Sequence, residues 1–215
     1  MEIRGAIFDF DGTLMDSMHI WDSLGAAYLK TLGITADDDL NDILMTMSMA
    51  EGAAHFQSHY KVQKTVEEIT DGINQQIEYW YFEVVQLKEG VKPLLEHFKK
   101  QGIKMCIATA TDQYLVEACL KRNHIFDYFE AIFTCTQVKA SKESPLIYLT
   151  AVEYLDTDIS KTLVFEDALY AIQTAKNAGF HVVGVYDQFS EDGQEEIKST
   201  ADRYLKTFSD WEEIL

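Results

Sequence analysis

The sequence is poor in prolines, in cysteines and in basic residues, and each shortage excludes a class of protein. Two prolines, Pro93 and Pro145, and the lack of any Gly/Ser-rich tract exclude long disordered linkers. Three scattered cysteines, none of them in a C-x-x-C pair, are too few for a disulfide framework. We therefore expect a protein of the reducing cytoplasm.

Charge and hydrophobic patterning limit the partners of the chain. Its 18 Lys and Arg residues against 36 Asp and Glu residues give a formal net charge of −18, which argues against binding to nucleic acid or to anionic membranes. No apolar run approaches the length of a membrane span, and the N-terminus lacks a charged segment followed by an apolar one. We expect a soluble, unexported, cytoplasmic monomer that acts on a small molecule.

The periodic patterns divide the chain into a core and an insertion. Residues 16–87 contain helical patterns but no clear strand, so we predict a helical cap domain there. Beyond residue 90, helical patterns alternate with apolar strands, which predicts a parallel sheet with helices on both faces. Residues 1–15 and 88–215 then form an α/β catalytic core. Its later strands are predicted at 103–109, 131–134, 162–165 and 181–185.

The most informative motif lies at the start of the chain. The apolar run 6–10 carries Asp9 and is followed by Asp11, Gly12 and Thr13, as expected for a buried parallel strand that ends at a ligand site. Alternation along an extended strand predicts that Asp9 and Asp11 project to the same side, and Gly12 permits a tight turn. Two close carboxylates repel each other unless a cation joins them. Mg²⁺ is the simplest candidate, because it takes oxygen ligands and binds together with substrate phosphate.

Three further polar clusters follow the next three predicted strands. The second strand ends at Thr109, Lys142 lies in the loop after the third, and Glu166 and Asp167 follow the fourth. In a doubly wound sheet, the carboxyl ends of the strands meet at one edge even when they are far apart in the sequence. These clusters are therefore predicted to face the two N-terminal aspartates.

Taken in this order, the four clusters resemble the motifs of the haloacid dehalogenase superfamily, in the branch that contains β-phosphoglucomutase and its sugar-phosphatase relatives. The resemblance covers essentially the whole chain. It implies a doubly wound, Rossmann-like parallel sheet with an inserted all-α helical cap, phosphoryl transfer, and Mg²⁺ as the cofactor. The motifs that carry it are DFDGT at 9–13, IAT at 107–109, SKESP at 141–145 and VFED at 164–167.

The resemblance and the demands of phosphoryl transfer imply roles for these side chains. Asp9 would attack phosphorus and form an aspartyl-phosphate. Asp11 would protonate the leaving oxygen and later take a proton from water. Lys142 would offset the charge of the nucleophile and of the phosphoryl group, while Thr109 and the backbone N–H groups from Ala110 onwards would hold phosphate oxygens.

The same resemblance implies a metal site. Asp167 would hold Mg²⁺ together with the Asp9 carboxylate and the Asp11 backbone carbonyl, and Glu166 would either bind the ion directly or position a ligand. Thr111 is predicted to cap the helix that follows it rather than to serve the site.

Two features of the predicted cap bear on the reaction. The resembling mutases carry a histidine on the first cap helix, and the matching position here is Trp21. His19 lies two residues earlier, which turns its side chain by ~200° on an α-helix, so it cannot substitute. This favours hydrolysis over mutase activity. The loop 44–49 contains three methionines, an adaptable surface that suits broad tolerance for small phosphate esters.

The sequence thus predicts a Mg²⁺-dependent phosphatase that hydrolyses a small phosphorylated metabolite, a sugar phosphate, through an aspartyl-phosphate on Asp9. Three alternatives stay open at this point: a β-phosphoglucomutase-like phosphomutase, a non-catalytic phosphate-binding or regulatory module, and a dehalogenase that uses the same aspartate. The acid/base candidate Asp11 argues against pure binding, and the complete set of acidic and basic clusters fits phosphoryl transfer better than dehalogenation.

Overall fold

The chain folds into two compact units, which the computed structural model describes for residues 2–44, 47 and 49–214. The first unit comprises Met1–Ser17 together with Val85–Leu215, and the second comprises Met18–Val84. Within the described ranges, the helices are too short or too polar to cross a membrane.

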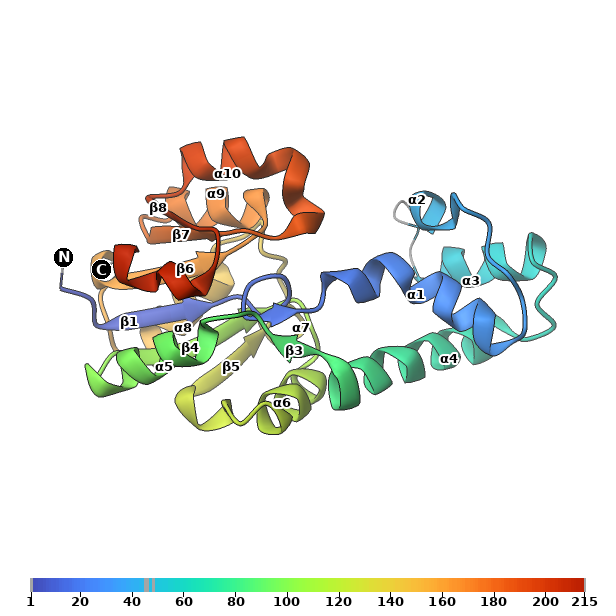
Figure 1. The fold of residues 1–215 in the computed structure, drawn as a ribbon, viewed down its shortest axis with the longest axis horizontal. Helices are drawn as coiled ribbons and strands as arrows, with labels where there is room; N and C mark the ends of the chain where they lie inside the picture. The colour runs from blue at the N-terminus through green and yellow to red at the C-terminus, as the bar shows by residue number, and fades with distance from the viewer. Residues whose placement is uncertain (1, 45–46, 48, 215) are drawn as a thin grey trace. The chain divides into compact units, whose positions relative to one another are not determined.

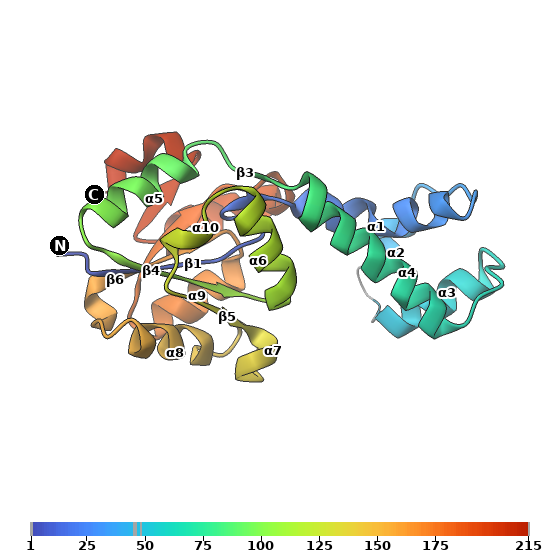
Figure 2. The ribbon, with the colours of Figure 1, turned by 90° about the horizontal axis from the view of Figure 1, so that it is seen from below.

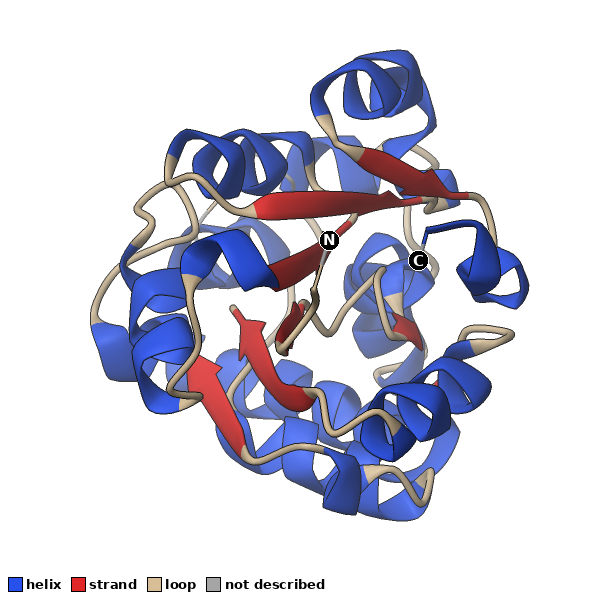
Figure 3. Ribbon diagram, turned by 90° about the vertical axis from the view of Figure 1, so that its left-hand side faces the viewer, coloured by secondary structure: helices blue, strands red, loops and turns tan. Residues whose placement is uncertain are grey.

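Six parallel strands form the sheet of the first unit (Figure 3), in the order β5-β4-β1-β6-β7-β8. Counted along the chain, this is the doubly wound order 3-2-1-4-5-6, in which ligands bind beside the first strand at the carboxyl edge. The predicted Rossmann-like α/β fold is therefore confirmed. The strands are β1 (Gly5–Phe8), β4 (Lys104–Thr109), β5 (Ala131–Thr134), β6 (Thr162–Glu166), β7 (His181–Val185) and β8 (Arg203–Leu205).

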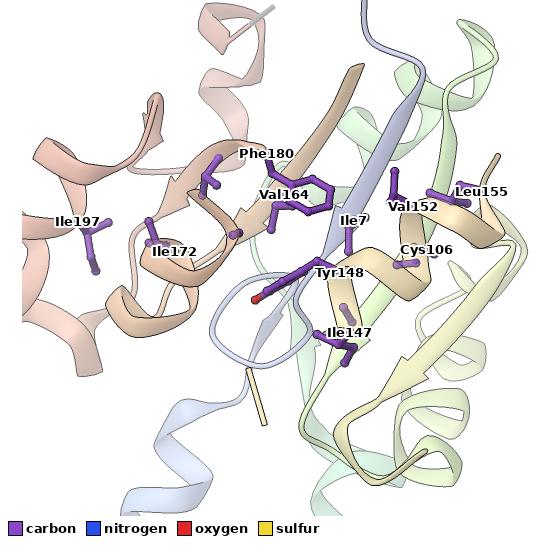
Figure 4. Close-up of a cluster of buried hydrophobic side chains, with 14 residues drawn as sticks. Ile7, Cys106, Ile147, Tyr148, Val152, Leu155, Val164, Ile172, Phe180 and Ile197 are labelled. Carbon is purple, nitrogen blue, oxygen red and sulfur yellow. The ribbon is translucent and has the colours of Figure 1, made fainter. Parts of the chain in front are cut away.

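Alternating side chains of these strands build an apolar layer on each face of the sheet. On one face, Ile7 and Val164 lie in a cluster with residues of α8, α9 and α10 (Figure 4). On the other face, the Phe8 and Phe165 rings stack with their centroids 4.5 Å apart, and Phe98 of α5 packs beside them. The α-helices of this unit are α5 (Val91–Lys100), α6 (Gln113–Arg122), α7 (Cys135–Val138), α8 (Leu146–Tyr154), α9 (Leu169–Asn177) and α10 (Gln194–Thr200).

Shorter elements complete this unit, and the sequence did not reveal them. A two-stranded antiparallel ladder pairs β2 (Met15–Asp16) with β3 (Gln86–Leu87), the two segments through which the chain leaves and re-enters the core. The edge strand β8 was likewise not predicted. The 3-10 turns are η2 (Phe126–Tyr128), η3 (Ile159–Lys161), η4 (Gln188–Gly193) and η5 (Phe208–Ile214).

The second unit is helical in the part of the chain that is described. Its longest helices, α1 (Met18–Thr31) and α4 (Val66–Tyr79), pack alongside each other (Figures 1 and 2). Thr65 begins α4 with a capping box that Glu68 completes. The other helical segments are α2 (Leu40–Leu44), α3 (Met49–Ser58) and the π-helical turn η1 (Trp80–Val84). Three residues of the methionine-containing loop, at 45, 46 and 48, lie outside the described residues.

Candidate active site

The carboxyl ends of β1 and β6 bring the predicted acidic side chains together. Pairing between the two strands continues past β1, since the Asp9 N–H donates to the Phe165 carbonyl at 2.9 Å. Asp9 is thereby fixed beside Glu166, the last residue of β6, and Asp167 directly after it. All three are buried although they are ionisable, which is costly without compensating charge.

Lys142 supplies part of that compensation. Its side chain is buried, and its Nζ donates to an Asp9 carboxylate oxygen and to Glu166 Oε1, the latter at 2.7 Å. Burial by itself lowers the pKa of Lys142, but the Asp9 and Glu166 carboxylates outweigh it and raise that pKa well above its usual range. The ammonium therefore stays charged at neutral pH.

The acidic cluster still carries more negative charge than one lysine balances. Carboxylate oxygens of Asp9, Glu166 and Asp167 lie within 4.8 Å of one another. Burial, reinforced by the Asp9 charge, raises the pKa of Glu166 to about 7. Burial and the charge of Glu166 also raise the pKa of Asp167.

Three carboxylates and one ammonium leave a formal charge of minus two. A divalent cation that prefers oxygen ligands fits this donor set.

Neighbouring hydroxyl groups hold these acids in place. The Thr13 hydroxyl donates to Asp167 Oδ1 at 3.1 Å, and the Tyr148 hydroxyl lies 3.3 Å from Glu166 Oε1. Glu166 also accepts from the Asp167 backbone N–H at 3.0 Å. The sequence pattern places Thr13 in the motif at 9–13 but predicts no role for it, and it predicts no part in the site for Tyr148. Tyr148 lies on α8, where its position in an apolar pattern indicates a core residue and nothing more.

Asp11 has a different environment from Asp9. We predicted an extended strand that runs through both residues, and this is wrong because β1 already ends at Phe8. The chain then turns back on itself, and the Met15 N–H donates to the Phe10 carbonyl at 2.9 Å. Gly12 adopts a φ of 74°, which glycine tolerates best.

Two hydroxyl groups bind the Asp11 carboxylate. Ser17 Oγ donates to its Oδ1 at 2.6 Å, and Thr111 Oγ1 donates to its Oδ2 at 2.5 Å. The prediction that Thr111 only caps a helix is therefore wrong, since Asp112 occupies the N-cap of α6. Capping was predicted because a threonine before a helix commonly caps it, and the contact with Asp11 spans 100 positions of sequence.

The predicted phosphate-binding residues lie at the end of β4. Thr109 is buried as the last residue of that strand, and its Oγ1 accepts from the Thr111 N–H at 3.0 Å. Ala110 follows in an exposed bend. Because β4 pairs directly with β1, Thr109 and Ala110 lie near the carboxyl end of β1. Their contact with phosphate stays a prediction.

The doubly wound sheet and the acidic, lysine-bearing centre at its edge are typical of an α/β enzyme, and known proteins resemble the chain in both sequence and fold. Residues 6–185 match the family model of the haloacid dehalogenase-like hydrolases. The chain therefore belongs to this family and is a hydrolase. The side chains of the buried cluster, those of Asp9, Lys142, Glu166 and Asp167, come from motifs on which the predicted resemblance rests.

Individual relatives extend over nearly the full chain. A phosphorylated carbohydrates phosphatase of Thermotoga maritima is 28% identical over 214 residues, covering 99% of this chain and 97% of the relative. A solved structure of a proposed β-phosphoglucomutase, also from Thermotoga maritima, superimposes with a TM-score of 0.87 at 27% identity, covering 99% of this chain and all of the other.

Another relative was solved with a sugar bisphosphate. An aspartate-to-asparagine variant of CbbY from Rhodobacter sphaeroides, in complex with xylulose-(1,5)bisphosphate, superimposes with a TM-score of 0.75 at 25% identity. The match covers 97% of this chain and 96% of CbbY.

Proposed function

We propose that the protein is a Mg²⁺-dependent phosphatase that hydrolyses a small phosphorylated metabolite, a sugar phosphate, through an aspartyl-phosphate on Asp9. The observation that carries the proposal is the buried contact of Asp9 with Lys142 inside the cluster with Glu166 and Asp167. An aspartate held between an ammonium and further carboxylates is arranged for attack on an anionic phosphate. The relatives named above support a phosphorylated carbohydrate as the substrate class.

The first half of the reaction forms the covalent intermediate. A carboxylate oxygen of Asp9 attacks phosphorus, and the bond between phosphorus and the ester oxygen breaks. Asp11 gives its proton to the departing alkoxide, so the alcohol leaves neutral. Lys142 offsets charge on the transferring group, while Thr109 and the Ala110 N–H hold phosphate oxygens.

In the second half, water attacks the phosphorus of the aspartyl-phosphate. Asp11 accepts a proton from this water, the bond from phosphorus to Asp9 breaks, and inorganic phosphate leaves. Asp9, Asp167 and the Asp11 carbonyl would hold Mg²⁺, with Glu166 as a direct ligand or as a group that positions one. When bound, the ion supplies the charge neutralisation that lets an anionic nucleophile approach an anionic substrate.

The helical unit Met18–Val84 serves, in this proposal, as the cap that selects the substrate. Trp21 on α1 stands where the resembling mutases carry a histidine, which favours hydrolysis over return of the phosphoryl group to the sugar. A phosphomutase is the competing function, and interconversion of two sugar phosphates without release of phosphate would identify it.

A panel of phosphate esters tests the proposal. The purified protein should release inorganic phosphate from sugar phosphates in the presence of Mg²⁺, and a chelator should stop the release until Mg²⁺ is added back. Asp9→Asn should abolish turnover while the far-UV circular dichroism spectrum is unchanged. Asp202→Asn is the matched control, because Asp202 pairs with Lys176 elsewhere on the surface.

Three results would contradict the proposal. Near wild-type turnover by Asp9→Asn would remove the nucleophile from it, and indifference to both chelator and Mg²⁺ would remove the metal. Failure to release phosphate from every ester of the panel, with intact folding, would refute phosphatase activity and favour a binding module.

A further inference from the structure

Lys88 lies immediately after β3, and its ammonium group makes three polar contacts. Its Nζ donates to the Gly12 carbonyl, to the Tyr186 carbonyl at 2.7 Å and to Asp187 Oδ2 at 2.8 Å. A lysine ammonium has three N–H donors, so these contacts use all of them. The Lys88 side chain is 16% exposed and that of Asp187 only 4%. The interaction is therefore largely shielded from water.

The segment that Lys88 holds is the turn that carries Asp11. Besides the side-chain contact at Gly12, the Lys88 backbone N–H donates to the Leu14 carbonyl at 2.9 Å. The turn is closed internally by the Gly12 N–H, which donates to the Met15 carbonyl at 3.1 Å. Lys88 thus binds the turn from outside at two carbonyls on either side of Thr13, the residue that donates to Asp167.

Asp187 anchors the other end of this contact to the sheet. It follows β7 and Tyr186, whose N–H donates to the Leu205 carbonyl of β8 at 2.9 Å. Asp187 Oδ1 also accepts from the Phe189 N–H at 2.9 Å, which fixes the carboxylate. The ammonium therefore connects a rigid strand end to the catalytic turn.

We infer that Lys88 is a positioning residue for the proposed reaction: by holding the Gly12 carbonyl against the end of β7, it sets the position of the Asp11 carboxylate for proton transfer. The inference rests on the proposed phosphatase function. Among the described residues, Lys88 contacts neither Asp9 nor Lys142, so we expect its effect on the Asp11 turn rather than on phosphate binding. Its charge also acts on Asp167, and the variants are therefore compared at saturating Mg²⁺.

The ion pair of Lys88 with Asp187 could instead contribute only to stability. Two variants separate that role from the positioning of the turn, because Lys88 contacts Asp187 and Gly12 at the same time. Lys88→Met leaves the Asp187 carboxylate buried without its cation and the Gly12 carbonyl without its donor. The double variant Lys88→Met, Asp187→Leu removes the stranded charge but still lacks a donor for Gly12. Replacing both members of a buried pair by apolar groups is often neutral for stability, whereas removing one member is costly.

The expected result is a divergence between stability and turnover. Lys88→Met should lower both the melting temperature and kcat, the latter by about tenfold or more, with KM within about threefold of wild type. The double variant should recover most of the melting temperature but stay low in kcat. Lys176→Met, which breaks the more exposed pair with Asp202, is the matched control and should leave kcat unchanged.

A second readout does not depend on turnover. Hydrogen exchange of the Gly12 and Leu14 amides, which donate within the turn, should be faster in both Lys88→Met variants than in wild type. Recovery of kcat in parallel with the melting temperature in the double variant, or unchanged exchange in the turn, would overturn the inference. If wild type itself releases no phosphate, the proposed function fails, and the exchange measurement still decides whether Lys88 holds the turn.

Discussion

Replacing Lys142 by methionine should destabilise the α/β unit strongly. The substitution keeps an unbranched side chain only one atom shorter and removes its charge. In the native site, the ammonium is buried and contacts the carboxylates of Asp9 and Glu166, with Asp167 close by. The metal-free cluster then changes from a formal charge of minus two to minus three, among side chains that are buried.

The size of the effect follows from this loss of compensation. Removing one partner of a buried ion pair costs about 3–5 kcal/mol, because the other charge is left unpaired in a medium of low dielectric. Partial protonation of Glu166, whose pKa already lies at about 7, relieves some of this cost near neutral pH. We therefore expect a loss of about 3 kcal/mol in the free energy of unfolding at pH 8 in the presence of a chelator.

The fluorescence of Trp211, which belongs to the α/β unit, reports the free energy of unfolding of that unit in a denaturant titration. Trp21 and Trp80 belong to the helical unit and should be replaced by phenylalanine in all samples, so that the two units are not confused. Lys176→Met provides the control, with an expected loss of at most about 1 kcal/mol, because its pair with Asp202 is about 30% exposed. Mg²⁺ should stabilise Lys142→Met more than wild type, since the ion then meets a larger uncompensated charge.

A loss below about 1 kcal/mol for Lys142→Met would refute this reasoning, because it would mean that the three carboxylates are not stabilised by the ammonium. Equal stabilisation of wild type and variant by Mg²⁺ would refute the second part, the competition between two sources of positive charge for the same cluster.

Three further outcomes are expected. Thr111→Val removes the hydroxyl that donates to Asp11 Oδ2 and should lower kcat by about tenfold with little change in KM, as steady-state kinetics would show. Gly90→Ala should lower the free energy of unfolding by well over about 2 kcal/mol, because φ is 85° and a Cβ would lie 2.2 Å from a backbone nitrogen of η5. Gly102→Ala should lower it by only about 1 kcal/mol, because φ is 71° but no heavy atom of the described residues lies within 4 Å of the added Cβ. Denaturant unfolding measures both values. Burial alone raises the pKa of Asp202, but hydrogen bonds from Lys176 and from the Val182 N–H lower it overall. The stability advantage of wild type over Asp202→Asn, measured by denaturant unfolding, should therefore be complete above pH 3.8, the ordinary value, and should be lost as the pH falls through the lowered pKa.

The core of the fold was predictable because its strands are buried on both faces. Ala131–Thr134 and His181–Val185 have the bounds that the apolar runs predict, and the strand ends gave the acidic residues of the site. Gly102 and Gly179 lie just beyond the C-caps of α5 and α9 and adopt a positive φ, the position and conformation in which glycine commonly ends a helix. Each of these features depends on residues that are neighbours in the sequence or on the order of the strands in the sheet, and a sequence pattern can therefore predict it.

The remaining features depend on contacts that no local pattern announces. The strands β2 and β3 contain two residues each, too few for alternation to be visible. The contact between Lys88 and Gly12 spans 76 positions of sequence, and a lysine two residues before a glycine otherwise indicates a solvated turn. Such contacts arise only when the sheet order brings the segments together.

In the proposed reaction, the different surroundings of Asp9 and Asp11 would allow two identical side chains to perform unequal tasks. The Asp9 side chain contacts a cation, the Lys142 ammonium, which offsets the negative charge of a carboxylate nucleophile. Two neutral hydroxyls, those of Ser17 and Thr111, bind Asp11, and a hydroxyl can donate to a carboxylate or accept from a carboxylic acid by rotating its proton. The hydroxyl pair can therefore hold Asp11 in one position through both protonation states, whereas an ammonium in the same place would oppose protonation. In the proposed reaction, Asp11 would therefore give up and take back its proton without a change of position, held by Ser17 and Thr111 in both steps.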